Sequence, residues 1–346
     1  MTDSTSGPDF TRTYNSYDGI WRHTYSASVR TSSDGNIAVI HSDGRESYFT
    51  QQSSSYLAST FDKGLLEKSL TGWIYSSEDG GTFTFDDSGK LTGSTSPSGA
   101  SYSVSHTSNI LTIVDNLGRT ITIAEDYLHQ PLSFTSEGIQ ATYSYDSSFR
   151  LLGMTKSSAG KTSKNGYYYE DASNPSLLTR TTDENGVSIH NWKYNTDKKI
   201  ISVEGPSQQG TISYNYGPDG SMTATNEYGK QTKYRYQFVQ GINRITAIEG
   251  EPSPNCPSSN STFTYDAGGL LKTKTDAKGN ITTYDYNDRG LETSRTEASG
   301  TLQARTTTTE WHPTLFLKTK VTEPDRITTY QYDAQGRQTG QIVTPR

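Results

Sequence analysis

Aromatic and polar residues alternate along most of the chain, and this alternation predicts β-strands. The recurring unit is an aromatic residue, any residue, a second aromatic residue, and then Asp, Asn or Gly. Residues i and i+2 of a strand lie on the same face of a sheet, so each aromatic pair is expected to share one face. The clearest copies are Phe83/Phe85/Asp86, Tyr143/Tyr145/Asp146, Trp192/Tyr194/Asn195, Tyr214/Tyr216/Gly217, Phe263/Tyr265/Asp266, Tyr284/Tyr286/Asn287 and Tyr330/Tyr332/Asp333.

The copies recur at a nearly regular distance, which indicates a repeat architecture. Counted from Tyr145, the second aromatic residues follow one another at steps of 24, 25, 22, 20, 29, 21, 25 and 21 residues. Each step has room for two turns and two strands of about five to seven residues. The series includes weaker copies at Tyr167/Tyr169 and Tyr234/Tyr236, and Trp311, which keeps one aromatic residue.

Turn signals lie between the predicted strands. Asp and Asn side chains accept hydrogen bonds from nearby backbone amides, and Gly supplies the positive φ that closes a turn. Phe149 and Lys198 replace the glycine that is expected three residues after Asp146 and Asn195. Glycines stand at that position in five other copies, and a second Asp-to-Gly step follows in several units: Gly89, Gly220, Gly269, Gly290 and Gly336, then Asp115–Gly118, Asp183–Gly186 and Asp276–Gly279.

The composition indicates how these hairpin units assemble. Only 30% of the residues are hydrophobic and the mean hydropathy is −0.76, but the chain has 24 Tyr and 95 Ser plus Thr. Disordered chains lack aromatic residues, and a lone hairpin is only marginally stable. Stacked units would align aromatic pairs across strands, each contributing about 0.2–1 kcal/mol. We therefore predict an all-β chain with a long, curved antiparallel sheet that forms a single-layer wall, because so few aliphatic residues cannot fill a sandwich core.

Two segments depart from the repeat. Glu249 to Asn260 holds three prolines and the single cysteine, Cys256, and predicts an insertion loop, since proline is excluded from central strands. Ser53 to Leu70 places Leu57, Phe61, Leu65 and Leu66 near helical spacing, which predicts a short helix.

Charge and hydropathy exclude several classes of protein. The chain has 31 Lys plus Arg against 37 Asp plus Glu, a net charge of −6, and no basic stretch, so nucleic-acid binding is not expected. Its longest apolar run, near Ile110 to Val114, is far below the roughly 20 residues of a membrane span. Residues 1–5 have neither a basic start nor an apolar core, so export is expected to use a route that reads no such signal, or the sequence has been shortened.

The Tyr-x-Tyr-Asp-x-x-Gly-Arg/Leu pattern resembles the YD repeat of the Rhs (rearrangement hot spot) family. Further stretches strengthen the resemblance, which runs from about Trp21 to the C-terminus. They are Trp21-Arg22-His23-Thr24-Tyr25 followed by Asp43-Gly44-Arg45, Thr71-Gly72-Trp73 followed by Phe83 to Leu91, Thr179 to Gly186, and Tyr332-Asp333-Ala334-Gln335-Gly336-Arg337.

The resemblance implies a β-sheet that spirals as a solenoid into a hollow shell, here part of an Rhs cocoon. Bacterial relatives enclose a C-terminal toxin and take part in its delivery, whereas related animal proteins act in cell adhesion. The final Val343-Thr344-Pro345-Arg346 carries no self-cleaving core segment and no toxin, so the sequence is expected to be the N-terminal part of a shell. The expected partners are a toxin cargo and the remaining shell of the same protein, with a secretion-apparatus component, and the expected location is secreted or at the cell surface.

We expect residues 1–20 to be an N-terminal extension and residues 21–346 the repeat shell, with an irregular opening over about 21–82 and the insertion loop over about 249–260. The residues assigned to the structure of the repeat are Tyr143, Tyr145, Asp146, Tyr214, Tyr216, Phe263, Tyr265, Asp266, Gly269, Tyr284, Tyr286, Gly290, Tyr330, Tyr332, Asp333 and Gly336.

The acidic residues and histidines that could form a catalytic or metal site are explained by turn formation or by their scattered positions. Acids recur at every turn, as turn formation alone requires, so they do not single out the paired carboxylates of a glycosidase. No segment has the ligand spacing of an EF-hand, and the six histidines are scattered. We therefore predict no catalytic residue, metal site or cofactor. The alternative function is carbohydrate binding or adhesion through exposed rows such as Tyr284/Tyr286 and Tyr330/Tyr332, because aromatic rings stack on sugars.

Overall fold

The computed structural model is built from β-strands, and its described residues contain no α-helix, which confirms the all-β prediction. None of these residues forms a helix long and apolar enough to cross a membrane. The described residues are 2–3, 9–32, 35–52, 55–58, 62, 64–78, 80–96, 99–206, 209–239, 242–250, 260–313, 315–333 and 336–346.

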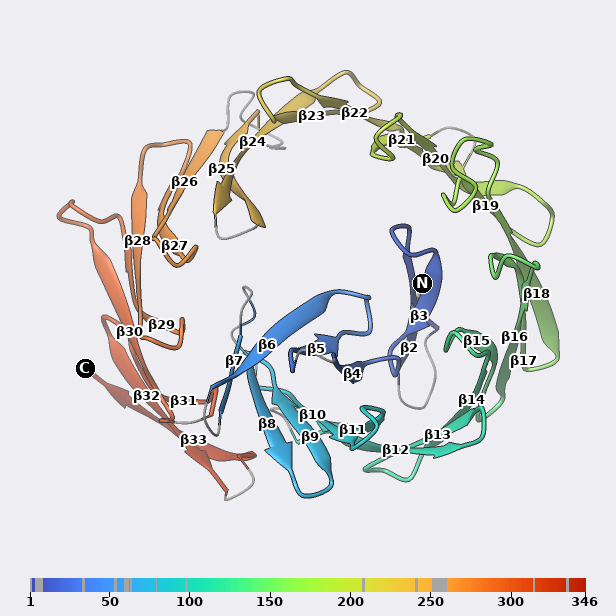
Figure 1. Ribbon diagram of the computed structural model, residues 1–346. Coiled ribbons are helices and arrows are strands. Elements are labelled where there is room, and N and C mark those ends of the chain that lie inside the picture. Colours follow the sequence, from blue (N-terminus) through green and yellow to red (C-terminus); the bar gives the residue numbers. More distant parts are fainter. Residues whose placement is uncertain are drawn as a thin grey trace.

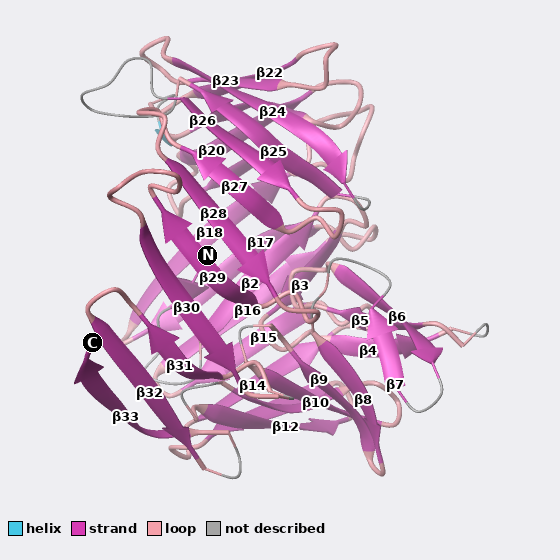
Figure 2. Ribbon diagram, turned by 90° about the vertical axis from the view of Figure 1, so that its left-hand side faces the viewer, coloured by secondary structure: helices cyan, strands magenta, loops and turns pink. Residues whose placement is uncertain are grey.

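One antiparallel sheet contains every strand from β4 to β33, and each strand pairs with its neighbours in chain order. The sheet bends round into a ring of strands (Figure 1). Seen from the side, the later strands lie next to one another in a tilted ladder (Figure 2). The structure therefore confirms the predicted long, curved antiparallel wall.

The first strands fold inside the ring (Figure 1). Strands β1 to β3 form a small separate sheet, and β4 to β11 begin the main one. Their bounds are β1 (Thr2–Asp3), β2 (Phe10–Asn15), β3 (Ile20–His23), β4 (Ser28–Thr31), β5 (Ile37–Ile40), β6 (Glu46–Gln52), β7 (Ser55–Ala58), β8 (Leu65–Ser69), β9 (Gly72–Ser76), β10 (Thr82–Asp86) and β11 (Leu91–Thr95).

The wall continues through two further series of strands. The first is β12 (Ser101–Thr107), β13 (Ile110–Asp115), β14 (Thr120–Glu125), β15 (Pro131–Ser136), β16 (Ile139–Tyr145), β17 (Leu151–Ser158), β18 (Lys161–Tyr168), β19 (Arg180–Thr182), β20 (Ser188–Tyr194), β21 (Ile200–Glu204) and β22 (Ile212–Tyr216). The second is β23 (Met222–Thr225), β24 (Gln231–Val239), β25 (Ile242–Glu249), β26 (Asn260–Tyr265), β27 (Leu271–Thr275), β28 (Ile281–Tyr286), β29 (Glu292–Glu297), β30 (Arg305–Trp311), β31 (Lys318–Thr322), β32 (Arg326–Tyr332) and β33 (Gln338–Pro345).

The helix expected over Ser53 to Leu70 is wrong. Within the described part of this segment, β7 and β8 are strands of the main sheet, and Tyr56 pairs with Leu66. The spacing of the leucines misled because adjacent strand positions face opposite sides: Leu65 is exposed and Leu66 is buried. Phe61 and the proline-rich part of the expected insertion loop, residues 251–259, lie outside the described residues.

The hydrophobic core lies between the N-terminal strands and the first part of the wall. The β2–β3 hairpin packs against it through Phe10, whose ring stacks on Phe134 of β15 at 4.5 Å. The expected division between residues 20 and 21 falls inside this hairpin. After Leu178, only Leu291, Phe316 and Leu317 are buried apolar residues among those described, and the other buried side chains in that stretch are hydroxyl-bearing: Thr181, Thr182, Ser202, Ser221, Thr232, Ser261, Thr309 and Thr328.

Candidate functional site

The turn of the repeat is built by one carboxylate or amide oxygen. In the turn after β16, the Oδ1 atom of Asp146 accepts hydrogen bonds from the backbone amides of Ser148 and Arg150, both at 2.9 Å. The amide of Phe149 donates to the Asp146 carbonyl oxygen at 3.0 Å. Burial alone would raise the pKa of Asp146, but these bonds and the Arg150 side chain hold it below its usual range. The same turn recurs at Asp266, Asn287 and Asp333. In each, the side-chain Oδ1 atom accepts a hydrogen bond from the backbone amide four residues later.

The third residue after the Asp or Asn has positive φ at every turn of this kind described here. Gly269, Gly290 and Gly336 have φ of 77°, 74° and 79°. Phe149 and Lys198, which replace the glycine, are held at 61°. The backbone conformation of the turn therefore persists even where a side chain makes it unfavourable.

The second aromatic residue of most units lies at a β-bulge, and Tyr216, which pairs with Met222 in regular register, is an exception. The register between paired strands shifts at Tyr145, Tyr194, Tyr265, Tyr286, Trp311 and Tyr332. A bulge leaves ladder groups unpaired and sharpens the local twist of the strand. Repeating it in most units provides a physical reason for the sheet to curve into a ring.

The hydroxyl groups of these second aromatic residues bind the preceding part of the wall. Tyr145 donates to the carbonyl oxygen of Pro131 at 2.8 Å, and Tyr216 donates to that of Ile200 at 2.8 Å. Each bond crosses from one repeat to the one before it, so it ties neighbouring units together. Burial raises the tyrosine pKa in this series, to about 12 at Tyr194. The other members donate in the same way: Tyr194 to Leu178, Tyr265 to Ile245, Tyr332 to Lys318, and the indole of Trp311 to Glu292.

The first aromatic residues of the units differ between the two ends of the wall. Tyr143 is buried, and its ring lies 4.6 Å from the guanidinium carbon of Arg12. Tyr214, Phe263, Tyr284 and Tyr330 are half-buried and share a face with the second aromatic residue of their own pair.

A buried ionisable cluster joins the N-terminal hairpin to the wall. Glu125, at the end of β14, accepts a hydrogen bond from His23 Nε2 at 2.7 Å and contacts His129 Nδ1 at 3.0 Å. The Nδ1 atom of His23 accepts from the amide of Tyr25, so its Nε2 carries the donated hydrogen. Burial alone would raise the pKa of Glu125, but the two histidines lower it, and Glu125 raises the pKa of His129. No group of three His, Cys, Asp or Glu in the described part of the chain has the arrangement of a metal site.

His129 stands at the glycine position of a further turn of the same kind. Its φ is 62°, and its amide donates to the carbonyl of Asp126 at 3.1 Å. The next residue, Gln130, is fully buried, accepts from the amide of Trp21 and donates to the carbonyl of Phe149. This turn is therefore the place where the hairpin binds the wall. The sequence could have revealed this turn, because Asp126 and His129 are three residues apart, like the Asp and Gly of the other turns.

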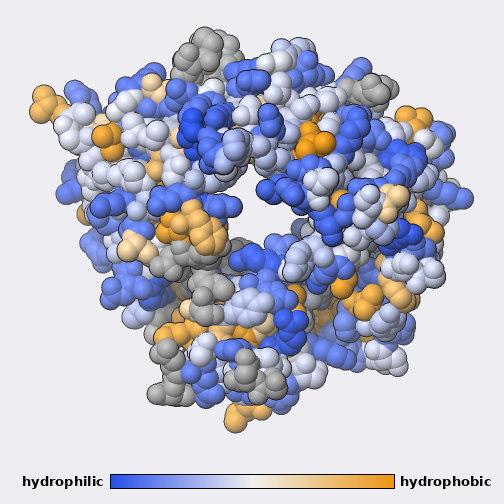
Figure 3. Space-filling view, turned by 45° about the horizontal axis from the view of Figure 1, so that its top comes forward, coloured by the Kyte–Doolittle hydropathy of each residue, from blue (hydrophilic) through white to orange (hydrophobic). Residues whose placement is uncertain are grey.

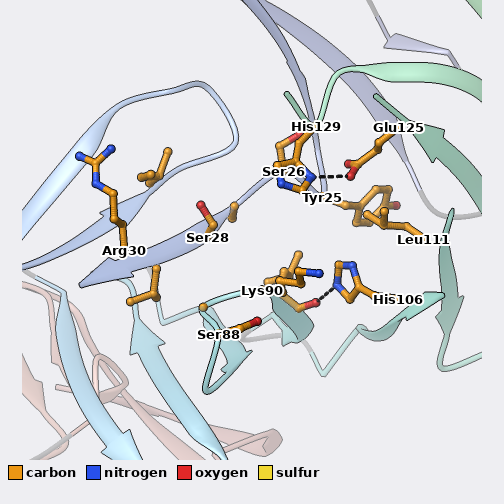
Figure 4. Close-up of a pocket in the computed structure, with 15 residues that line it drawn as sticks. Tyr25, Ser26, Ser28, Arg30, Ser88, Lys90, His106, Leu111, Glu125 and His129 are labelled. Carbon is orange, nitrogen blue, oxygen red and sulfur yellow. Dashed lines mark hydrogen bonds and ion pairs between the residues drawn. The ribbon is translucent and has the colours of Figure 1, made fainter. Parts of the chain in front are cut away.

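A cavity adjoins this cluster, between β4 and the turn that joins β10 to β11 (Figure 4). Tyr25, Val29, Leu91 and Leu111 contribute apolar surface, and Lys90 and other ionisable groups lie around them. β4 reaches the turn through a bridge between Ser28 and Lys90, and the amide of Val29 donates to the Gly89 carbonyl at 2.8 Å.

The ring is closed by side chains at a seam. Since the wall is antiparallel, the aromatic-Asp turns lie on one edge and the second Asp-to-Gly turns on the other. The first edge, at Leu315–Leu317 and Gly336–Arg337, meets the second edge at Ser76, Gly80, Thr82, Thr95, Ser96 and Gly99. A Cβ atom built on Gly99 would lie 4.0 Å from that of Arg337. No paired register joins β33 to β4 in the described residues.

Arg289 fixes the shape of the loop that enters the seam. Its guanidinium donates to the carbonyls of His312, Pro313 and Leu315 at 2.7, 2.8 and 2.9 Å, and lies 4.8 Å from the ring of Phe316. Phe316 is thereby buried in an otherwise polar stretch of wall. The sequence reasoning did not identify this loop, although the run Leu315-Phe316-Leu317 is a visible apolar signal.

Comparison with known proteins finds a family model that matches one part of the wall. Residues 260–302, which include β26 to β29 and the turns at Asp266 and Asn287, match the model of the RHS repeat. The chain therefore contains an RHS repeat at these residues. The resemblance to the Rhs family is therefore confirmed, and the hairpin of β26 and β27 followed by that of β28 and β29 shows the RHS repeat in three dimensions.

One solved structure has a similar fold over most of this chain, and others are similar at lower TM-scores. A crystal structure of TcdB2-TccC3 without its hypervariable C-terminal region has a TM-score of 0.51 and 13% identity, over 93% of this chain and 19% of that one. TcdB2-TccC3 itself gives 0.48 and 10%, over 99% and 26%. The Photorhabdus luminescens Tc holotoxin pore gives 0.35 and 12%, over 99% and 21%. This chain thus spans about a fifth of the length of the first of these proteins. No curated protein matches it in sequence.

Proposed function

We propose that this chain is a structural segment of an Rhs-type shell that encloses a toxin polypeptide and presents it for transfer to another cell. The observation that carries the proposal is the seam, which brings turns more than two hundred residues apart into contact and so closes a ring around a hollow. The space-filling view shows an opening in the middle of one face, bordered largely by hydrophilic residues (Figure 3).

The wall beside the hollow is suited to containment. From residue 179 onward it is a single layer, held by backbone ladders, bulge tyrosines and turn carboxylates. Such a wall needs no second layer to remain folded, so its inner face stays open to another polypeptide. The cargo, the remaining shell and a secretion-apparatus component would be the partners, and the protein would act outside the cell that makes it.

The alternative, a carbohydrate-binding or adhesion surface, has less support. A sugar site would need aromatic rings with free polar edges. The Tyr332 hydroxyl is already committed to a backbone carbonyl, and Tyr284 and Tyr286 are half-buried at a bulge. Selective binding on a glycan array, lost in Tyr330→Ala, would favour the adhesin.

Protease protection tests containment. The gene product is purified with whatever polypeptide its reading frame encodes beyond Arg346, and the release of fragments of that polypeptide by a broad-specificity protease is followed by mass spectrometry. We expect protection in the native protein, loss of protection in Arg289→Ala, and protection in the matched control Arg305→Ala, whose side chain is exposed. Equal cleavage of the polypeptide in the native protein and in Arg289→Ala would contradict enclosure by this seam.

A further inference from the structure

The cavity beside the hairpin–wall junction has about 290 Å³ of space, near the lower end of small-molecule sites. It lies where β4 leaves the hairpin and meets the β10–β11 turn (Figure 4). Three short side chains in a row, Ser26, Ala27 and Ser28, line it on the β4 side, and their size explains why space remains there.

The wall of the cavity is rigid on the side of the turn. Gly89 has a φ of 83°, and a Cβ atom there would lie 1.8 Å from the carbonyl oxygen of Val29. Only glycine permits this close approach of two backbones. The turn is therefore fixed against β4, and the cavity between them is preformed and not dependent on a mobile loop.

The apolar part of the cavity is formed by buried side chains. Tyr25, Val29, Leu91 and Leu111 are each less than a tenth exposed and line it together. They offer a ring face and branched aliphatic carbons, which suit the hydrocarbon body of a small ligand.

The polar part of the cavity holds one ammonium group, that of Lys90, beside ionisable groups that are already paired. Both carboxylate oxygens of Glu125 are already used by His23 and His129, and Arg30 is paired with Glu46 at 2.9 Å. Lys90 points its ammonium group toward the cavity (Figure 4), and no described residue accepts a hydrogen bond from its Nζ atom. A ligand carboxylate would supply the acceptor for the Lys90 ammonium group.

His106 adds a directional contact. Its Nε2 atom donates to the carbonyl oxygen of Leu91 at 2.7 Å, so in the neutral ring the Nδ1 atom keeps a lone pair. The cavity thus has a cationic donor, an acceptor and an apolar floor within one small volume.

We propose that this cavity binds a small carboxylic acid with an aromatic or branched apolar body, its carboxylate on Lys90 and its body on Tyr25, Val29 and Leu111. This site does not depend on the proposed shell function. The carboxylate could belong to a free acid or to the C-terminus of a polypeptide, which share the same chemistry.

Fluorine NMR tests the site with para-fluorophenylacetate as the probe and the intact chain as the receptor. We expect saturable binding, at least about tenfold weaker in Lys90→Met and unchanged in Lys278→Met, an exposed lysine of a distant turn. The neutral probe para-fluorophenylacetamide should also bind at least about tenfold more weakly, because it lacks the charge.

Competition identifies the source of the carboxylate. Displacement of the probe by N-acetylphenylalaninate more readily than by phenylacetate assigns the site to a polypeptide C-terminus, and the reverse order assigns it to a free acid; both orders support the site. Ala27→Leu, which fills the cavity, should abolish binding in a protein that keeps its β-sheet circular dichroism. Absence of any saturable change in the probe signal, or equal affinity in the native protein and in Lys90→Met, overturns the proposal.

Discussion

Residues 9–178 and residues 179–346 use the same hairpin unit, but only the first stretch places a second layer of chain against the wall. There, Phe10, Trp21 and the strands β4 to β7 cover the inner face, and Phe134, Ile121 and Ile123 are fully buried. In the second stretch the buried positions are mostly Ser and Thr. The difference shows that this wall obtains its shape from ladders, bulges and turns, while a hydrophobic core is added only where another segment packs on it.

The largest predicted effect comes from removing core volume on the covered side. Phe134→Ala should lower the free energy of unfolding by about 3–5 kcal/mol, because a fully buried ring that stacks on Phe10 is replaced by a cavity. The matched change Phe263→Ala, at a half-buried ring in the uncovered stretch, should cost less than half as much. Equal losses in thermal or chemical unfolding would remove the distinction between the two stretches.

A smaller effect is expected where the hairpin binds the wall. Glu125→Gln should cost about 2 kcal/mol, since a buried carboxylate with two histidine partners becomes a neutral amide. Hydrogen exchange should increase in β2 and β3 and not in β20 to β33. If exchange rose uniformly, the hairpin would not be a separate layer.

The turns of the uncovered stretch should be sensitive to β-branched residues. Gly290→Val should cost about 1–2 kcal/mol, because φ of 74° is strained for any residue with a Cβ atom. Gly268→Ala is a suitable control in a neighbouring turn, because its φ does not lie in the positive range. An unchanged melting temperature in Gly290→Val would contradict the turn geometry.

The two stretches should also differ in their stability at low pH. The pKa values of Asp146 and Asp276 are lowered in the fold, so each carboxylate contributes stability that is present above its unfolded pKa and is lost as the pH falls through the folded value. Stability should therefore decline below about pH 4. Residues 179–346 have little core to offset the loss, and their amides should lose protection first as the pH is lowered. Loss of protection in residues 9–178 first would reverse the comparison.

The smallest effect is a gain. Lys198→Gly relieves about 1–2 kcal/mol of backbone strain at a φ of 61°. It also adds about 0.5–1 kcal/mol of chain entropy cost, so the net stabilisation should lie between about 0 and 1.5 kcal/mol. Phe149→Gly should gain less, because the Phe149 ring packs edge-on against Tyr127 at 4.9 Å. A melting temperature lowered by Lys198→Gly would contradict this interpretation of the turn.

The local structure of the wall was predictable from the sequence because its cause is local. Tyr265, Asp266 and Gly269 specify a strand face, a turn start and a positive φ within five residues, and the structure has each feature there. The strand that begins at Leu65 was not predictable from the spacing of its apolar residues, because it forms by pairing with β9. The seam at Phe316 depends on curvature summed over many bulges. The pairing of His23 with Glu125 likewise requires the hairpin to lie inside the ring.

The seam is the contact on which containment depends, and disulfide trapping tests it most directly. In a Cys256→Ser background, Gly99→Cys and Arg337→Cys would place two Cβ atoms about 4.0 Å apart, within the range of a disulfide. Under mild oxidation we predict a cross-link between these positions in the monomer, found by peptide mass spectrometry. The control pair Gly118→Cys and Arg337→Cys should give none, since Gly118 has no atom of another segment within 4 Å. Failure of the first pair to cross-link, or equal cross-linking of both pairs, would show that the ring does not close as described.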